Sequence, residues 1–140
     1  MRRDILIGAV FMIIIAVIAM IFFLFYFGAP AAEITSATTD QNLYHSGDLM
    51  TITVSLYSSG QMDNTTLKFE GITDKNGRAR LSHDMQANLS WGPNTYFYEY
   101  ELPHCSSCAG LNPGDYDVIV TLSRDTEILD RANLSVRIEQ

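Results

Sequence analysis

The stretch Tyr116-Asp117-Val118-Ile119-Val120-Thr121-Leu122-Ser123 alternates between apolar and mostly polar side chains. Successive side chains of a β-strand point to opposite faces of its sheet, so a period of two is typical of a strand with one buried face. The same alternation recurs in residues 51–56, 67–70, 85–91, 96–102 and 134–139. It predicts antiparallel strands, each exposed to water on one side.

The alternation also predicts which side chains face the core. They are Ile52, Val54 and Leu56; Leu67 and Phe69; Met85, Ala87, Leu89 and Trp91; Tyr96, Tyr98, Tyr100 and Leu102; Tyr116, Val118, Val120 and Leu122; Leu134, Val136 and Ile138. Turn residues separate the runs, such as residues 44–48 and the pair Asn76-Gly77, which suits the positive φ of a tight hairpin. Seven or eight short strands over residues 33–140 indicate an all-β domain, a β-sandwich.

A long apolar run precedes the strands. Residues 5–27 contain no Asp, Glu, Lys, Arg or His, and Arg2 and Arg3 stand just before them. A helix of this length reaches roughly 34 Å, enough to cross a hydrocarbon core of about 30 Å. Arginine favours the cytoplasmic side of a span. We therefore expect a cytoplasmic tail at residues 1–4, a transmembrane helix at 5–27, a linker at 28–32 and the domain outside the cell membrane.

A cleaved signal peptide is the alternative to a retained anchor. Its apolar region is shorter, about 7–15 residues, and small residues follow it. Residues 29–32, Ala-Pro-Ala-Ala, are small, but the apolar run is longer than a signal peptide needs, and Pro30 is unfavourable beside a cleavage site. The pattern favours a single-pass anchor.

The charge and the motifs restrict the partners. The whole chain has a formal charge of −7, and from Gly28 onward 15 Asp and Glu face 7 Lys and Arg, a charge of −8. This field disfavours nucleic acid and anionic lipid. The sequence lacks Gly-x-Ser-x-Gly, His-Glu-x-x-His and a phosphate-binding loop, so we expect no enzyme, no cofactor and no small-molecule ligand. The three histidines, His45, His83 and His104, all precede Cys105, which does not fit a cupredoxin copper site.

The end of the chain resembles a family. Leu111-Asn112-Pro113-Gly114-Asp115-Tyr116-Asp117-Val118, followed by a short hairpin into a last strand, is similar to the closing strands of immunoglobulin-like sandwiches on prokaryotic, especially archaeal, cell surfaces. The resemblance implies an immunoglobulin-like antiparallel β-sandwich after one transmembrane α-helix. It also implies that Tyr116 is a corner tyrosine bonded to backbone. The layout is similar to small stator subunits of the archaeal swimming filament.

Cys105 and Cys108 are the two cysteines of the chain. Outside the membrane the environment usually oxidises thiols, so we expect a disulfide that closes a small loop. A redox-active pair, a metal site with His104 and two free thiols are the alternatives.

Other surface features concern glycans and partners. Asn64, Asn88 and Asn133 begin glycosylation sequons, all on the outer side of the predicted membrane span. In the aromatic stretch 96–100, burial of the tyrosines would turn Phe97 outward beside Glu99 and Glu101. Exposed aromatic residues can anchor a protein partner, so these three residues are the predicted contact site.

These observations predict a non-catalytic, membrane-anchored extracytoplasmic module for protein–protein interaction or surface assembly. One alternative is an accessory, stator-like subunit of a larger membrane or filament complex. Another is a redox or metal-handling protein that uses Cys105 and Cys108. The thiol state and the bound metal would separate these classes.

The cysteine prediction can be tested by intact mass with and without reduction. Because short loops constrain the unfolded chain only modestly, replacing Cys105 and Cys108 by Ser should lower the free energy of unfolding by about 1–3 kcal/mol without abolishing folding. Two thiols that alkylate freely before reduction would contradict the disulfide and favour the metal site.

Overall fold

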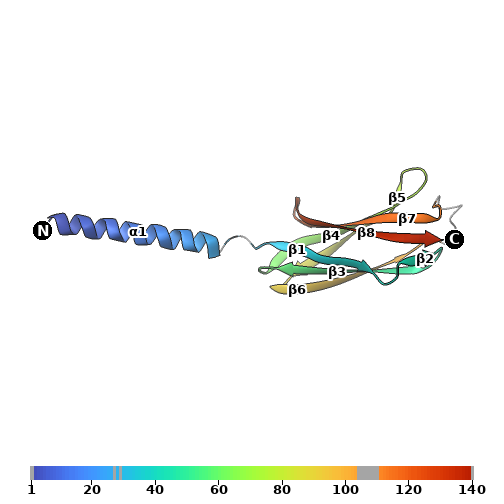
Figure 1. Ribbon diagram of the computed structural model, residues 1–140, viewed down its shortest axis with the longest axis horizontal. Helices are drawn as coiled ribbons and strands as arrows, with labels where there is room; N and C mark the ends of the chain where they lie inside the picture. Colours follow the sequence, from blue (N-terminus) through green and yellow to red (C-terminus); the bar gives the residue numbers. More distant parts are fainter. Residues whose placement is uncertain (1, 27, 29, 104–110, 140) are drawn as a thin grey trace.

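The computed structural model describes residues 2–26, 28, 30–103 and 111–139, and within the helix it describes the side chains of residues 11–23. These residues form one helix and eight strands (Figure 1). The elements are α1 (Arg2–Tyr26), β1 (Ala32–Thr39), β2 (Leu43–His45), β3 (Leu49–Ser58), β4 (Met62–Thr73), β5 (Ala79–Leu89), β6 (Gly92–Glu101), β7 (Gly114–Arg124) and β8 (Glu127–Glu139).

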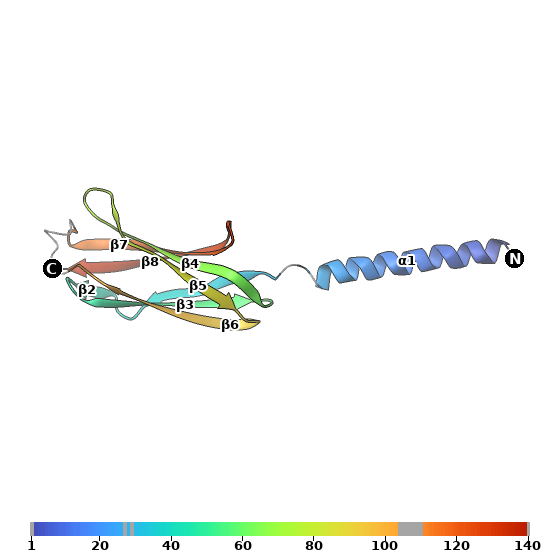
Figure 2. The same ribbon diagram turned by 180° about the vertical axis from the view of Figure 1, so that it is seen from behind.

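The strands form two sheets that pack face to face, as both views show (Figures 1 and 2). One sheet has three antiparallel strands in the order β1-β3-β6, and the other has five in the order β2-β8-β7-β4-β5. The predicted all-β sandwich is confirmed. One detail differs, because β2 runs parallel to β8 while every other pair is antiparallel.

The core forms where the predicted inner faces of the strands meet. The central strands β3, β4 and β7 bury these side chains completely, with at most 1% of their surface exposed: Ile52, Val54, Leu56, Leu67, Phe69, Val118, Val120 and Leu122. The tyrosines of β6 are only half-buried, because β6 is an edge strand of the smaller sheet. The period of two therefore predicted the strand faces correctly in the middle of both sheets.

Two aromatic residues depart from the sequence interpretation. Trp91 continues the apolar alternation of residues 85–91 but is 77% exposed, because β5 ends at Leu89 and Gly92, with a φ of 96°, turns the chain into β6. Tyr44 was placed in a turn but is completely buried in β2. Strands β1 and β2 were not among the predicted runs.

The helix α1 lies away from the sandwich (Figure 1). Its residues 11–23 are apolar and exposed on all sides of the helix. Within the part of the chain that the structure describes, no helix meets the length and apolarity that a membrane crossing requires. The predicted end of the helix, residue 27, lies outside the described residues.

A hydrogen-bond cluster around the buried Tyr44 joins the end of β1 to β3. The Tyr44 hydroxyl donates to Asp40 Oδ1 at 2.7 Å and accepts from the Gln41 N–H at 2.9 Å. Asp40 Oδ1 also accepts from the Thr51 N–H at 2.8 Å. The Tyr44 hydroxyl, and then the Thr51 N–H, hold the pKa of the Asp40 carboxyl below its ordinary value of 3.8.

The substitution Tyr44→Phe tests this cluster. It should lower the free energy of unfolding at neutral pH by about 1–2 kcal/mol, because buried polar groups lose a partner. It should also raise the Asp40 pKa, which carboxylate NMR can follow. The Asp40 pKa is lower in the folded state than in the unfolded chain. The ionised Asp40 carboxylate therefore stabilises the fold at a pH above the unfolded-state pKa, and this stabilisation is lost as the pH falls through the folded-state pKa. The variant should therefore lose less stability on acidification than the parent.

The matched control is Tyr57→Phe, at a ring that is 45% exposed. It should change the free energy of unfolding by no more than about 0.5 kcal/mol. An equal cost for both variants would show that the Tyr44 hydroxyl has no special role.

Candidate functional site

The tyrosines of β6 connect the two sheets along one side of the sandwich. The Tyr96 hydroxyl donates to the Asn88 carbonyl at 2.6 Å, and the Tyr100 hydroxyl donates to the Arg80 carbonyl at 3.1 Å. Both carbonyls belong to β5, the edge strand of the five-stranded sheet. The hydroxyls thus satisfy backbone groups that an edge strand leaves unpaired.

Tyr98 lies between these two bonds, and its ring stacks on two rings of the other sheet. One neighbour is the buried Phe69, with ring centres 4.9 Å apart, and the other is the exposed His83, 4.4 Å away and nearly parallel. Burial raises the pKa of the Tyr96, Tyr98 and Tyr100 hydroxyls. The three inward tyrosines therefore determine which side chains of β6 face the core and which face outward.

The alternate side chains of β6 must then point outward. Phe97 is 63% exposed, and Glu99 and Glu101 are exposed as well. The outward orientation of Phe97 predicted from the sequence is correct. A role in binding a partner remains a prediction.

Phe97 lies between an uncharged row of the three-stranded sheet and a row that contains Glu99. Its register partner is Thr53, which also pairs with Thr38 of β1, and in the next row Ser55 pairs with Thr95. Strand β3 contains no charged residue. We call this outward surface the Phe97 face; it comprises Thr38, Thr51, Thr53, Ser55, Thr95, Phe97, Glu99 and Glu101.

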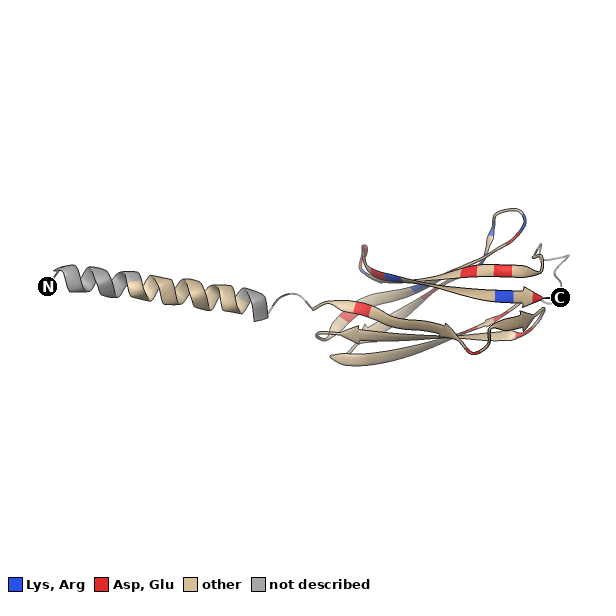
Figure 3. Cartoon of the chain, in the orientation of Figure 1, with Lys and Arg blue, Asp and Glu red and all other residues tan. Residues whose placement is uncertain are grey.

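The outer face of the five-stranded sheet is different, because it carries paired charges. Lys68 Nζ lies 2.7 Å from Glu70 Oε1, and Arg137 lies 3.9 Å from Asp115 and 3.3 Å from Glu139. Figure 3 shows charged positions of both signs along β7 and β8. The two outer surfaces of the sandwich therefore differ in chemistry.

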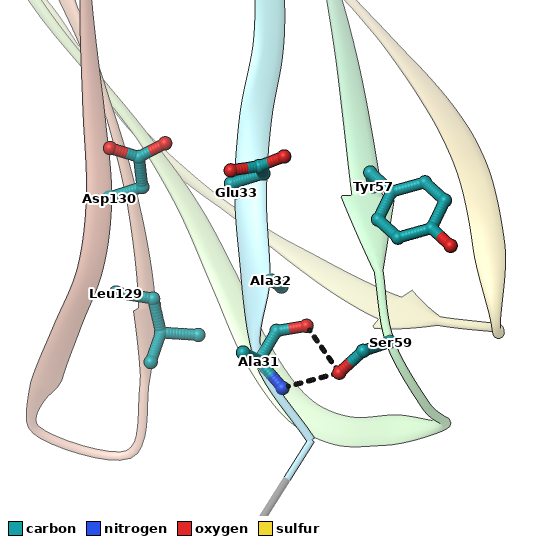
Figure 4. Close-up of a pocket in the computed structure, with 7 residues that line it drawn as sticks. All are labelled: Ala31, Ala32, Glu33, Tyr57, Ser59, Leu129 and Asp130. Carbon is teal, nitrogen blue, oxygen red and sulfur yellow. Dashed lines mark hydrogen bonds between the residues drawn. The ribbon is translucent and has the colours of Figure 1, made fainter.

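An open hollow of about 470 Å³ lies at the helix end of the sandwich (Figure 4). Two of its polar side chains bind backbone groups. Ser59 Oγ accepts from the Ala31 N–H at 2.9 Å, and Asp130 Oδ2 accepts from the Ile34 N–H at 2.7 Å. The lining residues are Ala31, Ala32, Glu33, Tyr57, Ser59, Leu129 and Asp130.

The remaining predicted sites have separate positions. Asn64, Asn88 and Asn133 are exposed, on β4, β5 and β8 of the five-stranded sheet. Asn64 has a φ of 58° at an irregularity in the pairing of β4 with β5. The cysteines Cys105 and Cys108 and the neighbouring His104 lie outside the described residues. Among the residues that the structure describes, no three His, Cys, Asp or Glu side chains group closely enough to hold a metal ion.

The resemblance-based expectation for Tyr116 fits the structure. Its hydroxyl donates to the Asn112 carbonyl at 2.5 Å and accepts from the Asn112 N–H at 3.0 Å. This contact fixes the entry into β7, as a corner tyrosine does. The sequence interpretation missed the exposed Trp91 and the hollow; the turn residues Gly92-Pro93 were the signal that Trp91 lies outside the strand alternation.

Comparison with known proteins identifies the fold only. Neither protein-family models nor curated proteins match the chain. The CARDB domain of a Pyrococcus furiosus protein has a TM-score of 0.50 at 12% identity, with 78% of this chain and 93% of that chain covered. The C-terminal domain of wzt has a TM-score of 0.58 at 14% identity, with 81% and 76% covered. The CARDB likeness supports an immunoglobulin-like sandwich.

A large enzyme also contains a similar domain. A putative β-galactosidase from Bacteroides fragilis has a TM-score of 0.55 at 21% identity, over 74% of this chain. This chain spans only 17% of the length of that enzyme. The likeness therefore concerns one domain of it.

Two neighbouring substitutions test the phase of β6. Tyr98→Ser should lower the free energy of unfolding by about 2–4 kcal/mol, because it removes the ring stacked between Phe69 and His83. Phe97→Ser should change it by no more than about 1 kcal/mol, as expected for a surface position. Urea unfolding of both variants measures the difference, and equal costs would place Phe97 in the core.

Proposed function

We propose that this chain is a non-catalytic, membrane-anchored module whose sandwich lies outside the cell and binds another surface or membrane protein through the Phe97 face. The observation that carries the proposal is a largely exposed phenylalanine that has threonine and serine residues and Glu99 around it on a well-braced sheet.

The composition of the Phe97 face suits a protein contact. The centre of a typical interface is depleted in charge and often contains an aromatic anchor, while the rim is polar. Phe97 has Thr53 beside it on β3, Thr95 and Glu99 two residues away on either side along β6, and Glu101 beyond Glu99. A partner with an apolar pocket bordered by basic groups would complement this arrangement.

The positions of the three sequons also favour the Phe97 face as the contact surface. All three lie on the five-stranded sheet, so glycans attached to Asn64, Asn88 or Asn133 would leave the Phe97 face uncovered. Glycans are bulky and solubilising, and they would shield the charged sheet instead.

The anchor rests on the sequence and on the exposure of α1. A helix that is apolar on every side requires an apolar environment around it. Residues 11–23 are apolar and exposed, they belong to the longer run 5–27, and Arg2 and Arg3 precede that run. A bilayer would provide this environment, with the arginines on the cytoplasmic side. The same exposed helix also supports the alternative of an accessory subunit held in a larger membrane complex.

A non-catalytic role is supported by the state of the hollow. Ser59 and Asp130 are engaged with backbone groups, and none of the described residues that line the hollow is a histidine. On the outer face of the five-stranded sheet, Lys68 pairs with Glu70 and Arg137 with Asp115.

Topology can be measured with protease added to intact cells. The sandwich should be degraded, while a tag before residue 1 should be protected until the membrane is broken. A sandwich that resists protease until lysis would contradict the outer location, and a mature chain that starts near Ala32 would contradict the anchor.

The partner surface can be tested by photo-crosslinking in native membranes. A photoreactive amino acid at Thr53, beside Phe97, should give an adduct of discrete mass, and the change Phe97→Ser should abolish it. The matched control is the same probe at the exposed Ser135, on the outer face of the five-stranded sheet, which should not give that adduct. The same adduct from Ser135 alone would assign the contact to the opposite sheet.

A further inference from the structure

Trp91 is the single tryptophan of the chain, and it is 77% exposed in the turn between β5 and β6. The turn is braced by Asn94. The Asn94 Oδ1 accepts from the Ser90 N–H and the Ser90 hydroxyl, each at 3.0 Å, and its amide donates to the Ser90 and Gly92 carbonyls at 2.9 Å. A large apolar ring is thus displayed on a rigid turn.

Trp91 lies at the end of the sandwich where the chain arrives from the helix. Ala32 and Gly92 both pair with Ser58, one from each side. Strands are spaced about 4.8 Å apart, so these two residues lie about 10 Å from each other. Trp91 directly precedes Gly92, and it is therefore close to the entry point of the chain.

The entry point itself is held firmly. The Ser59 hydroxyl accepts from the Ala31 N–H and donates to the Ala31 carbonyl at 3.2 Å (Figure 4). The Ser59 N–H donates to the same carbonyl at 2.9 Å. A Cβ added at Gly60 would meet Pro30 at 2.9 Å, so the chain already packs against this turn at Pro30. Only residues 27–29 remain between Tyr26 and the fixed chain, and three extended residues span at most about 10 Å.

A second apolar side chain is exposed near the same end. Ile128 is 51% exposed on β8, opposite Ser123 and close to the β7–β8 turn. The following residues Leu129 and Asp130 line the hollow together with Ala31. Trp91 and Ile128 thus lie near two different turns, both at the end of the sandwich where the chain enters from the helix.

We infer that Trp91 is embedded in the headgroup region of the bilayer, so that this end of the sandwich rests on the membrane surface. Indole suits that depth, because its apolar body and its N–H donor match a region that is part apolar and part wet. This placement rests on the proposed membrane anchor. Glu33, Asp125 and Glu127 at the same end would repel anionic headgroups, so zwitterionic lipid is the fitting surface.

The contact would set the height of the partner surface. Phe97 follows Trp91 by six residues along one strand, which corresponds to about 20 Å. The Phe97 face would then be presented sideways at roughly this distance above the headgroups, accessible to a partner in the same membrane.

The test uses the single tryptophan as its own reporter. The full chain is placed in phosphatidylcholine nanodiscs, with and without bromine on the acyl chains. Bromine near the upper acyl carbons should reduce the Trp91 emission at least twofold, and acrylamide should quench it weakly. Emission typical of a hydrated indole that brominated lipid leaves unchanged would overturn the inference. Protection from acrylamide without bromine quenching would indicate a protein contact and would overturn it as well.

The control is the double change Trp91→Phe and Phe97→Trp, which moves the reporter to the Phe97 face. Its emission should be insensitive to brominated lipid and fully accessible to acrylamide; quenching equal to that of the parent would show that the bilayer contact is not specific to the helix end. Vesicle flotation at high pH separates the two proposals. A chain that fails to float contradicts the anchor, whereas a chain that floats with an unquenched Trp91 contradicts only the inference.

Discussion

The stacking of Tyr98 between Phe69 and His83 is the interaction on which the rest of the structure depends. Each sheet alone would expose an apolar face, and an edge strand would leave backbone groups unpaired. Tyr98 fills the gap between the sheets, while the hydroxyls of Tyr96 and Tyr100 bond to the β5 backbone on either side of it. With the even-numbered rings turned inward, the pleat of β6 leaves Phe97 and Glu99 no orientation other than outward.

The strand alternation could be predicted from the sequence because burial on one face selects apolar residues at every second position. This held for the central strands, where Val54, Phe69 and Val120 are fully buried. It could not identify β2, since Tyr44 is buried through a parallel pairing with β8 that lies far away in the sequence. Trp91 was misplaced because the alternation seemed to continue through Ser90, whereas the chain actually turns at Gly92.

The candidate site was likewise predictable from the sequence only in part. The outward position of Phe97 followed from local pattern alone. The surroundings of Phe97 could not be predicted in this way, because Thr38 and Thr53 become its neighbours only through the pairing of three strands. The hollow could not be predicted either, because Ala31, Tyr57 and Asp130 come from distant segments of the chain. The resulting surfaces are distinct: an apolar turn at the helix end, a face centred on Phe97 with hydroxyl-bearing residues and two glutamates, and a charged sheet that carries the three sequons. Such a division suits a tethered module that meets the membrane at one end and a partner on one side.

Hydroxyl-radical footprinting tests the central claim most directly, because it reads the accessibility of Phe97 in native membranes without any substitution. The oxidation of Phe97 in those membranes is compared with that in the purified full chain, and the stacked Tyr98 serves as the internal reference. The account predicts that Phe97 is readily oxidised in the purified chain and strongly protected in native membranes, while Tyr98 reacts weakly in both. Equal oxidation of Phe97 in the two preparations would contradict a partner on the Phe97 face.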